Sequence, residues 1–297
     1  MTDVTIQNDT TARDAIMVFK PRIAVAIMLS AIGGMAVVDG PSPGLWQLSL
    51  LAIAVFLAAG SAGAFNQWIE HDLDARMKRT ANRPFVTGQF TAGPAWLAVI
   101  VGLLAAAVVL AGLATNWWAA LYTFLGAFTY GVIYTMWLKR RSWTNIVIGG
   151  LAGSFAVLAG AAAINPSIGI EAMLLTLVLF LWTPPHFWSL AMVSSDDYAR
   201  AGVPMLPVVA GKQLCAWVIL GHTLALSLIA LIPAWYGMGN LYLAGALAGG
   251  AIFTWTSIAL VYRPDRTRAL KNFFASLLQL CLLLGGAVAD RALGALI

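Results

Sequence analysis

Long apolar stretches alternate with short polar segments along the chain. Nine of the stretches are about 17 to 23 residues long, the length that lets an α-helix cross roughly 30 Å of hydrocarbon. They cover residues 23–39, 46–65, 94–114, 117–138, 144–163, 172–193, 214–234, 241–262 and 271–289. None shows the alternating ten-residue pattern of a membrane barrel strand, and backbone groups in hydrocarbon must be paired internally. We therefore predict an all-α, polytopic membrane protein with nine transmembrane helices.

The composition agrees with this pattern, because 61% of the 297 residues are hydrophobic and only 10% are charged. Such a chain is far more apolar than an ordinary globular domain, so its large partner is expected to be the lipid bilayer and not nucleic acid. We predict an N-terminal segment over residues 1–22 and a single transmembrane domain over residues 23–297. The first 19 residues resemble neither a signal peptide nor a transit peptide, which favours direct insertion into a bacterial inner (plasma) membrane.

The charged residues predict the orientation, since short cytoplasmic loops are rich in Lys and Arg. Placed against the nine predicted helices, 16 of the 17 cations fall on one side and only Arg291 falls on the other. The N-terminus is therefore expected in the cytoplasm and the C-terminus outside. Five of the twelve acidic residues also lie on the cation-rich side, in two loops: Glu70, Asp72, Asp74, Asp196 and Asp197. Topology requires only cations, so these acids indicate a functional site that faces the cytoplasm.

The first of these loops carries a regular spacing of oxygen-bearing side chains. Asn66, Glu70 and Asp74 are four residues apart, which places them on one face if the helix continues. Two carboxylates at that spacing repel each other unless a cation lies between them, and Mg²⁺ prefers such hard oxygen ligands together with substrate phosphates. Four cations follow within nine residues and could meet phosphate oxygens: Arg76, Lys78, Arg79 and Arg83. A solvated loop of mixed charges would explain neither the spacing nor the asparagine.

The segment from Asn66 to Pro84 resembles the first acidic motif of the UbiA superfamily of intramembrane prenyltransferases, with Glu70 where the superfamily has Asp. Within that superfamily, the chain is most similar to the protohaem IX farnesyltransferases, or haem O synthases. This narrower resemblance depends on residues 19–22 (FKPR), 134–141 (YTMWLKRR), 145–150 (NIVIGG), 182–188 (WTPPHFW) and 196–207. The stretch from Trp182 to Pro207 separates haem O synthases from relatives that make quinones.

The resemblance implies a UbiA-like helical bundle and an Mg²⁺-dependent transferase. The enzyme would move a farnesyl group from farnesyl diphosphate to a vinyl group of protohaem IX (haem B) and so make haem O, a step in haem A synthesis and cytochrome oxidase maturation. Haem would then be a substrate and not a cofactor, and a haem A synthase is a suggested partner.

The resemblance also implies roles for particular residues. The expected catalytic residues are Asn66, Glu70, Asp74, Lys78, Arg79, Arg83, Lys139 and His186. The expected substrate-binding residues are Lys20, Arg22, Arg140, Asp196, Asp197 and Tyr198. The expected metal ligands are Asn66, Glu70, Asp74, Asp196 and Asp197. His186 follows two prolines that are expected to widen the predicted helix 172–193 locally. It could ligate haem iron, orient the porphyrin, move a proton, or simply bond to the backbone that the prolines leave free.

Two departures and two alternatives remain. Relatives that act on aromatic acids carry a second DxxxD motif, but here Ser194 and Tyr198 occupy the positions of its two aspartates. Asp196 and Asp197 lie between them, and either one could face a second metal ion. Phe155 and Ala156 lie where a Pro-Pro pair is expected. The chain could instead be a UbiA-type enzyme that prenylates a quinone precursor. A transporter or channel is less consistent, because it predicts ionisable residues at mid-membrane depth.

Overall fold

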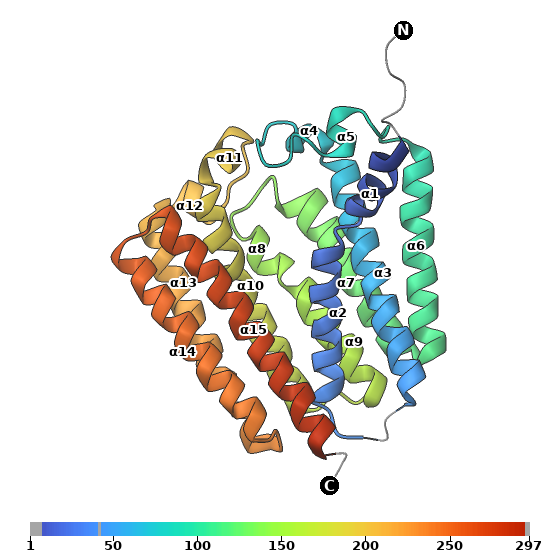
Figure 1. The fold of residues 1–297 in the computed structure, drawn as a ribbon, viewed down its shortest axis with the longest axis vertical. Coiled ribbons are helices and arrows are strands. Elements are labelled where there is room, and N and C mark those ends of the chain that lie inside the picture. Colours follow the sequence, from blue (N-terminus) through green and yellow to red (C-terminus); the bar gives the residue numbers. More distant parts are fainter. Residues whose placement is uncertain (1–7, 41–42, 295–297) are drawn as a thin grey trace.

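The structure is a computed structural model that describes residues 8–40 and 43–294, and within these ranges it contains helices and no strand (Figure 1). In chain order they begin with α1 (Asn8–Val18), α2 (Pro21–Ala36), α3 (Leu45–Ile69), α4 (His71–Asp74), α5 (Pro84–Thr87), α6 (Pro94–Ala114), α7 (Trp117–Phe128), the π-helix η1 (Thr129–Leu138), α8 (Asn145–Gly149) and α9 (Leu151–Ile164). They continue with α10 (Ile170–Val193), α11 (Ser195–Arg200), α12 (Leu206–Val209), α13 (Gly211–Ile229), the 3₁₀-helix η2 (Ile232–Tyr236), α14 (Asn240–Tyr262) and α15 (Arg266–Gly294).

Eight helical segments in the described ranges are long and apolar enough to cross a membrane. They are α3, α6, α10, α14, α15 and the three composite segments Trp117–Leu138, Asn145–Ile164 and Gly211–Tyr236. A ninth candidate is α2 with the end of α1, which meet at an angle of 45°. The predicted all-α, polytopic fold is thus confirmed. The first seven residues of the predicted N-terminal segment 1–22 lie outside the described ranges, and part of the rest forms α1.

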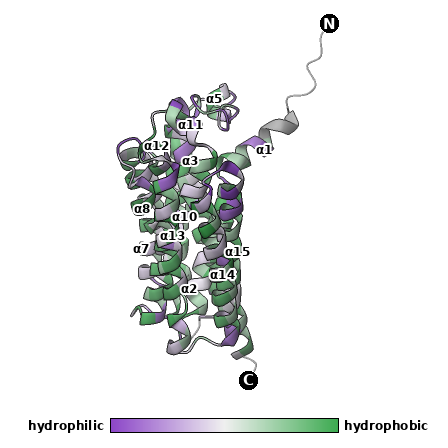
Figure 2. Ribbon diagram, turned by 90° about the vertical axis from the view of Figure 1, so that its left-hand side faces the viewer, coloured by the Kyte–Doolittle hydropathy of each residue, from purple (hydrophilic) through white to green (hydrophobic). Residues whose placement is uncertain are grey.

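The long helices run roughly parallel and leave the short helices α4, α5, α11 and α12 at one end of the bundle (Figure 1). Hydrophilic ribbon gathers at that end, whereas the long helices between the two ends are mostly hydrophobic (Figure 2). We call this the polar end. The pair α14 and α15 forms one flank of the bundle and α6 forms the other, with α2, α9 and α10 between them. The two acidic loops of the sequence therefore meet at one end of the bundle.

Two glycines let α2 and α9 approach each other closely. A Cβ atom added to Gly160 of α9 would overlap the carbonyl oxygen of Ala31 in α2 and would lie 2.8 Å from its carbonyl carbon. A Cβ atom added to Gly34 of α2 would overlap the carbonyl oxygen of Val157 in α9. Helices in a membrane associate through such close contacts, because lipid provides no hydrophobic driving force between them. The glycines therefore determine how near α2 lies to the centre of the bundle.

Gly160→Ala is expected to lower the free energy of unfolding by about 1–3 kcal/mol, because the added methyl group must push α2 away from α9. The measurement is the thermal midpoint of the purified protein in detergent. Gly102→Ala in α6 is the matched control, since a Cβ atom there would meet nothing within 4 Å. Equal midpoints for the two variants would contradict the close approach of α2 and α9.

Candidate functional site

The three residues of the first acidic motif are buried together at the polar end. Asn66, Glu70 and Asp74 are all 2% exposed or less. The continuous helix implied by their spacing is wrong, because α3 ends at Ile69 and Glu70 adopts φ −101° and ψ 15° before α4 begins. Hydrogen bonds from Glu70 N to Asn66 O (3.1 Å) and from Asp74 N to Glu70 O (2.8 Å) nevertheless preserve the four-residue repeat through the break. The motif therefore keeps its three side chains close.

Each member of the motif contacts a different cation from a different part of the chain. Lys139, which follows η1, forms an ion pair with Glu70. Arg83 Nη1 lies 2.5 Å from Asp74 Oδ2, and Lys20 Nζ donates to Asn66 Oδ1 over 2.5 Å. Without Arg83 or Lys139, the buried carboxylate of Asp74 or Glu70 would be left uncompensated, and without Lys20 the amide oxygen of Asn66 would lose its donor.

Lys20 is held in an unusual backbone conformation between α1 and α2. Its φ and ψ of 50° and 56° make it the only residue other than glycine with a positive φ in the described ranges. A side chain that is not glycine adopts the left-handed region at a cost of roughly 1–2 kcal/mol, and such strain concentrates at functional sites. Gly63 of α3 makes room for it, since a Cβ atom there would lie 3.4 Å from Lys20 side-chain atoms. From this left-handed turn the ammonium group reaches Asn66.

The π-helix η1 supplies the next layer of the site. Thr135 Oγ1 accepts a hydrogen bond from Asn66 Nδ2 (3.0 Å) and donates to the carbonyl oxygen of Tyr130 (2.8 Å), five residues earlier. Lys20 Nζ also donates to the hydroxyl of Tyr130 over 3.2 Å. The wide turn thus aligns Tyr130, Thr135 and Lys139 towards the motif, and π-helical turns are frequent at functional sites. Sequence reasoning missed Tyr130 and Thr135, although polar residues inside an apolar stretch were a signal that could have identified them.

One oxygen atom of the cluster has no partner in the described chain. Glu70 Oε2 is bonded to Lys139 and to Asn66 Nδ2 (2.6 Å), but Glu70 Oε1 is buried without a hydrogen bond. A buried carboxylate oxygen left unpaired costs free energy, so it points to a ligand from outside the chain. No group of three or more His, Cys, Asp or Glu residues suited to a metal ion occurs among the described residues. Glu70 Oε1 and the neighbouring side-chain oxygens of Asn66 and Asp74 are nevertheless hard donors that fit Mg²⁺, which binds a few protein oxygens and leaves positions for phosphate and water.

The second acidic loop lies on α11 and contributes a tyrosine to the site. Tyr198 is buried, and its hydroxyl accepts a hydrogen bond of 2.9 Å from Arg79 Nη2, whose guanidinium carbon lies 5.1 Å from the ring centre. Asp197 forms an ion pair with Arg200 on the same short helix, and Asp196 is exposed. Neither aspartate bonds to the first motif, so the two loops are joined by Arg79 and Tyr198. The metal roles of Asp196 and Asp197 stay predictions.

The remaining predicted residues at this end are exposed. Arg140 holds Asp72 through two hydrogen bonds of 2.7 and 2.9 Å, which lower the pKa of that carboxyl below its usual value. Arg22 and Lys78 form no ion pair with the described residues, which leaves both cations accessible at the polar end.

His186 lies apart from this cluster, on α10. The predicted widening at Pro184 and Pro185 is wrong, because α10 is α-helical from Ile170 to Val193 and the wide turns occur in η1 instead. The imidazole does not bond to backbone freed by the prolines. Its Nδ1 atom lies 2.7 Å from the hydroxyl of Ser276 in α15, and the residue is 8% exposed.

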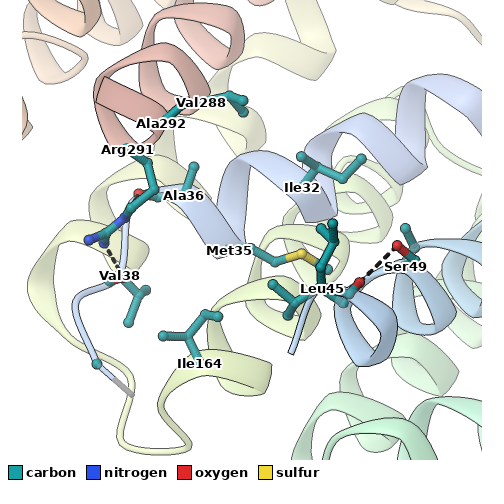
Figure 3. A pocket seen from close by; sticks show the side chains of 13 residues that line it. Ile32, Met35, Ala36, Val38, Leu45, Ser49, Ile164, Val288, Arg291 and Ala292 are labelled. Carbon is teal, nitrogen blue, oxygen red and sulfur yellow. Dashed lines mark hydrogen bonds between the residues drawn. The ribbon is translucent and has the colours of Figure 1, made fainter. Parts of the chain in front are cut away.

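An apolar cavity lies at the opposite end of the bundle. It has a volume of about 390 Å³ and is lined by apolar side chains of α2, α3 and α15, among them Met35, Leu45 and Val288 (Figure 3). Arg291 lies at its edge, but the guanidinium is already bonded to Asp39 and to backbone carbonyls of residues 36 and 38. No residue of the acidic motifs lines this cavity, so it is not the place for a diphosphate.

Comparisons with known proteins agree with this geometry. The sequence profile of the UbiA prenyltransferase family matches residues 27–278. A protein named protoheme IX farnesyltransferase 2 from Paramagnetospirillum magneticum is 54% identical over 276 residues, which cover 93% of this chain and 96% of that protein. A protoheme IX farnesyltransferase from Methylorubrum extorquens is 42% identical, with 95% of this chain and 90% of the relative covered.

Solved structures share the fold at lower sequence identity. A UbiA homolog from Archaeoglobus fulgidus bound to DMAPP and Mg²⁺ superimposes with a TM-score of 0.71 at 15% identity, over 92% of this chain and 98% of the other. The apo structure of a UbiA homolog from Aeropyrum pernix superimposes with a TM-score of 0.72 at 20% identity, over 91% of this chain and 98% of the other. The motif, the fold and the profile lead to one conclusion: this chain belongs to the UbiA prenyltransferase family.

Proposed function

We propose that this chain transfers the farnesyl group of farnesyl diphosphate to a vinyl group of protohaem IX and so makes haem O. The observation that carries the proposal is the buried cluster of Glu70, Asp74 and Asn66 with three cations. The acceptor is supported by relatives at 40–54% identity that are named protoheme IX farnesyltransferases. It is also supported by the stretch from Trp182 to Pro207, which resembles that group and differs from relatives that make quinones.

The cations of the cluster are suited to the diphosphate leaving group. Lys20, Arg83 and Lys139 converge on the motif from three segments, and preorganised donors of this kind stabilise charge that develops in a transition state. When the bond between C1 and the diphosphate oxygen breaks, negative charge grows on the leaving group at the point where these side chains lie. Arg79, held by Tyr198, and the exposed Lys78 and Arg22 would bind the outer phosphate oxygens.

Glu70, Asn66 and Asp74 would hold Mg²⁺, with Asp196 or Asp197 completing the site from α11 once a diphosphate bridges the two loops. The bound ion would supply positive charge to the diphosphate oxygens. Solved UbiA homologs from Archaeoglobus fulgidus bind Mg²⁺ together with DMAPP or GPP.

Burial protects the reaction from water. The allylic cation that forms at C1 reacts rapidly with solvent, and the motif is at most 2% exposed at the ends of apolar helices. The terminal vinyl carbon attacks C1, and one water molecule then adds its hydroxyl to the other vinyl carbon and releases a proton. The product carries a hydroxyethylfarnesyl side chain.

We also propose that residues 23–297 form one domain in a bacterial inner membrane, with the polar end towards the cytoplasm. The proposal is supported by 16 of the 17 cations on that side, as the positive-inside rule requires. A haem A synthase is the proposed partner, because it would receive the haem O that this chain makes.

The test is an assay of membranes that contain the protein. Incubation with haem, farnesyl diphosphate and Mg²⁺ is expected to yield haem O, identified by chromatography and mass spectrometry. Removing divalent cations with a chelator should abolish the product, and adding Mg²⁺ back should restore it. Formation of a prenylated aromatic acid without any haem adduct would contradict the proposed acceptor.

A further inference from the structure

A network of buried and partly buried polar side chains connects α10 with α14 and α15, away from the acidic cluster. Asn272 accepts hydrogen bonds from Thr256 (2.7 Å) and Ser257 (2.9 Å) and donates to Ser189 of α10 (2.9 Å). One turn further along α15, the backbone oxygen of Ser276 accepts from Trp182 Nε1 over 2.9 Å. Polar contacts inside a membrane protein fix the relative positions of helices, so α15 presents the hydroxyl of Ser276 to α10 in a defined place.

The hydrogen bonds of Ser276 determine where His186 carries its proton. A serine hydroxyl has one hydrogen, and Ser276 Oγ donates it to the carbonyl oxygen of Phe273 over 2.6 Å. The hydroxyl can therefore only accept from His186 Nδ1, which lies 2.7 Å away. A neutral imidazole with its hydrogen on Nδ1 has a lone pair on Nε2, and Nε2 has no hydrogen-bond partner among the described residues.

Aromatic rings hold the plane of this imidazole. The ring of Trp182 is centred 4.2 Å away at an interplanar angle of 17°, and the ring of Phe273 is centred 4.5 Å away at 28°. Phe187 meets the imidazole edge-on at 5.3 Å. With both its proton and its plane determined, Nε2 is preorganised as a lone-pair donor.

The depth of His186 indicates which substrate meets this nitrogen. His186 precedes the end of α10 by seven residues, which is about 10 Å along the helix axis. The diphosphate cluster lies at the polar end, from Asn66 in the last turn of α3 to Asp74 in α4, so Nε2 of His186 is expected to lie deeper in the membrane than the leaving group. Aromatic rings at this depth suit an apolar, planar acceptor, and a porphyrin offers an iron atom that binds imidazole nitrogen.

We propose that Ser276 is a positioning residue that fixes His186 in the Nδ1-protonated tautomer, so that Nε2 ligates the iron of the porphyrin acceptor. The inference rests on the proposed function for the identity of that acceptor. Ligating histidines generally donate their other ring nitrogen to a fixed acceptor, and loss of that acceptor costs 10- to 100-fold in metal affinity. Ser276 supplies this acceptor here.

The experiment titrates haem into the purified full-length protein in detergent, without farnesyl diphosphate, and records the optical and electron paramagnetic resonance spectra. The wild-type protein is expected to show imidazole-ligated iron, and His186→Gly is expected to lose this signature. Ser276→Ala should weaken haem binding by about 10- to 100-fold and raise the KM for haem, while the KM for farnesyl diphosphate stays unchanged. Ser189→Ala is the matched control, because it removes a buried hydroxyl between the same two helices without touching the imidazole.

A second measurement tests Ser276 without changing it. Imidazole added to His186→Gly should restore the spectrum, whereas 1-methylimidazole, which has no N–H to donate to Ser276, should restore it at least tenfold less effectively. Equal rescue by the two compounds would overturn the role of Ser276, as would an equal loss of haem affinity in Ser189→Ala and Ser276→Ala. An unchanged spectrum in His186→Gly would overturn the iron contact. These spectra are independent of turnover, so a wild-type protein that binds haem but makes no haem O would contradict only the proposed function.

Discussion

Glu70→Gln is expected to lower the initial rate of haem O formation by about 10³-fold. Glutamine preserves the size of the side chain but removes its charge, so the buried ammonium of Lys139 loses its counter-ion. The unpartnered Oε1 atom also ceases to be an anionic ligand for a divalent cation. Both effects act at the point where the diphosphate is expected to bind. Raising Mg²⁺ should restore the rate at most in part, because the variant also lacks the counter-ion of Lys139.

Asp72→Asn is the matched control for this variant. Asp72 belongs to the same short helix as Asp74, yet it is exposed, and its carboxylate is held by Arg140 and by the backbone of Leu73. An exposed ion pair contributes at most about 1 kcal/mol, so the rate should stay within about fivefold of the wild type. If Glu70→Gln kept more than a tenth of the wild-type rate, the placement of the metal and the leaving group at Glu70 would be wrong.

Lys139→Met is expected to reduce the free energy of unfolding by about 3–5 kcal/mol as well as to remove activity. The Lys139 side chain is 8% exposed and the Glu70 side chain is 1% exposed, so the variant leaves a buried carboxylate without its cation. The thermal midpoint of the purified protein reports the stability, and haem O formation reports the activity.

The double variant Lys139→Met/Glu70→Gln separates the two effects. It removes both charges together, so stability should return to within about 1 kcal/mol of the wild type while activity remains absent. Arg141→Met is the matched control, since Arg141 is exposed and, within the part of the chain that the structure describes, donates only to backbone carbonyls of residues 136 and 137. If the double variant were as unstable as Lys139→Met alone, the buried pair would not be the source of the instability.

The membrane-spanning architecture could be predicted because it depends on local properties of the chain. Apolar stretches of sufficient length must become helices in hydrocarbon, since only a helix pairs its backbone groups within one segment. The exact helix ends were less predictable: α3 extends to Ile69 and α15 begins at Arg266, both beyond the apolar stretches. Outside the hydrocarbon core, hydropathy no longer determines where a helix ends.

The acidic motif was predictable for a related reason. A spacing of four residues is maintained by backbone hydrogen bonds even where α3 is interrupted at Glu70, so the side chains stayed together although the assumed helix did not continue. The second acidic loop was less informative, because Asp197 is paired with Arg200 and Asp196 is exposed. The residue of that loop that contacts the first is Tyr198, through Arg79.

By itself, the sequence determined that this protein is a helical membrane protein with an acidic motif at one end, because the length of an apolar stretch and a four-residue spacing are both local properties of the chain. Only the tertiary structure decided which cation reaches which member of the motif. Lys20 and Asn66 are 46 residues apart, and Glu70 and Lys139 are 69 apart. Their contacts depend on the left-handed turn at Lys20, on the π-helical register of η1 and on the packing of separate helices. No local sequence pattern encodes contacts between residues so far apart in the chain, because these contacts form only when many side chains are buried together.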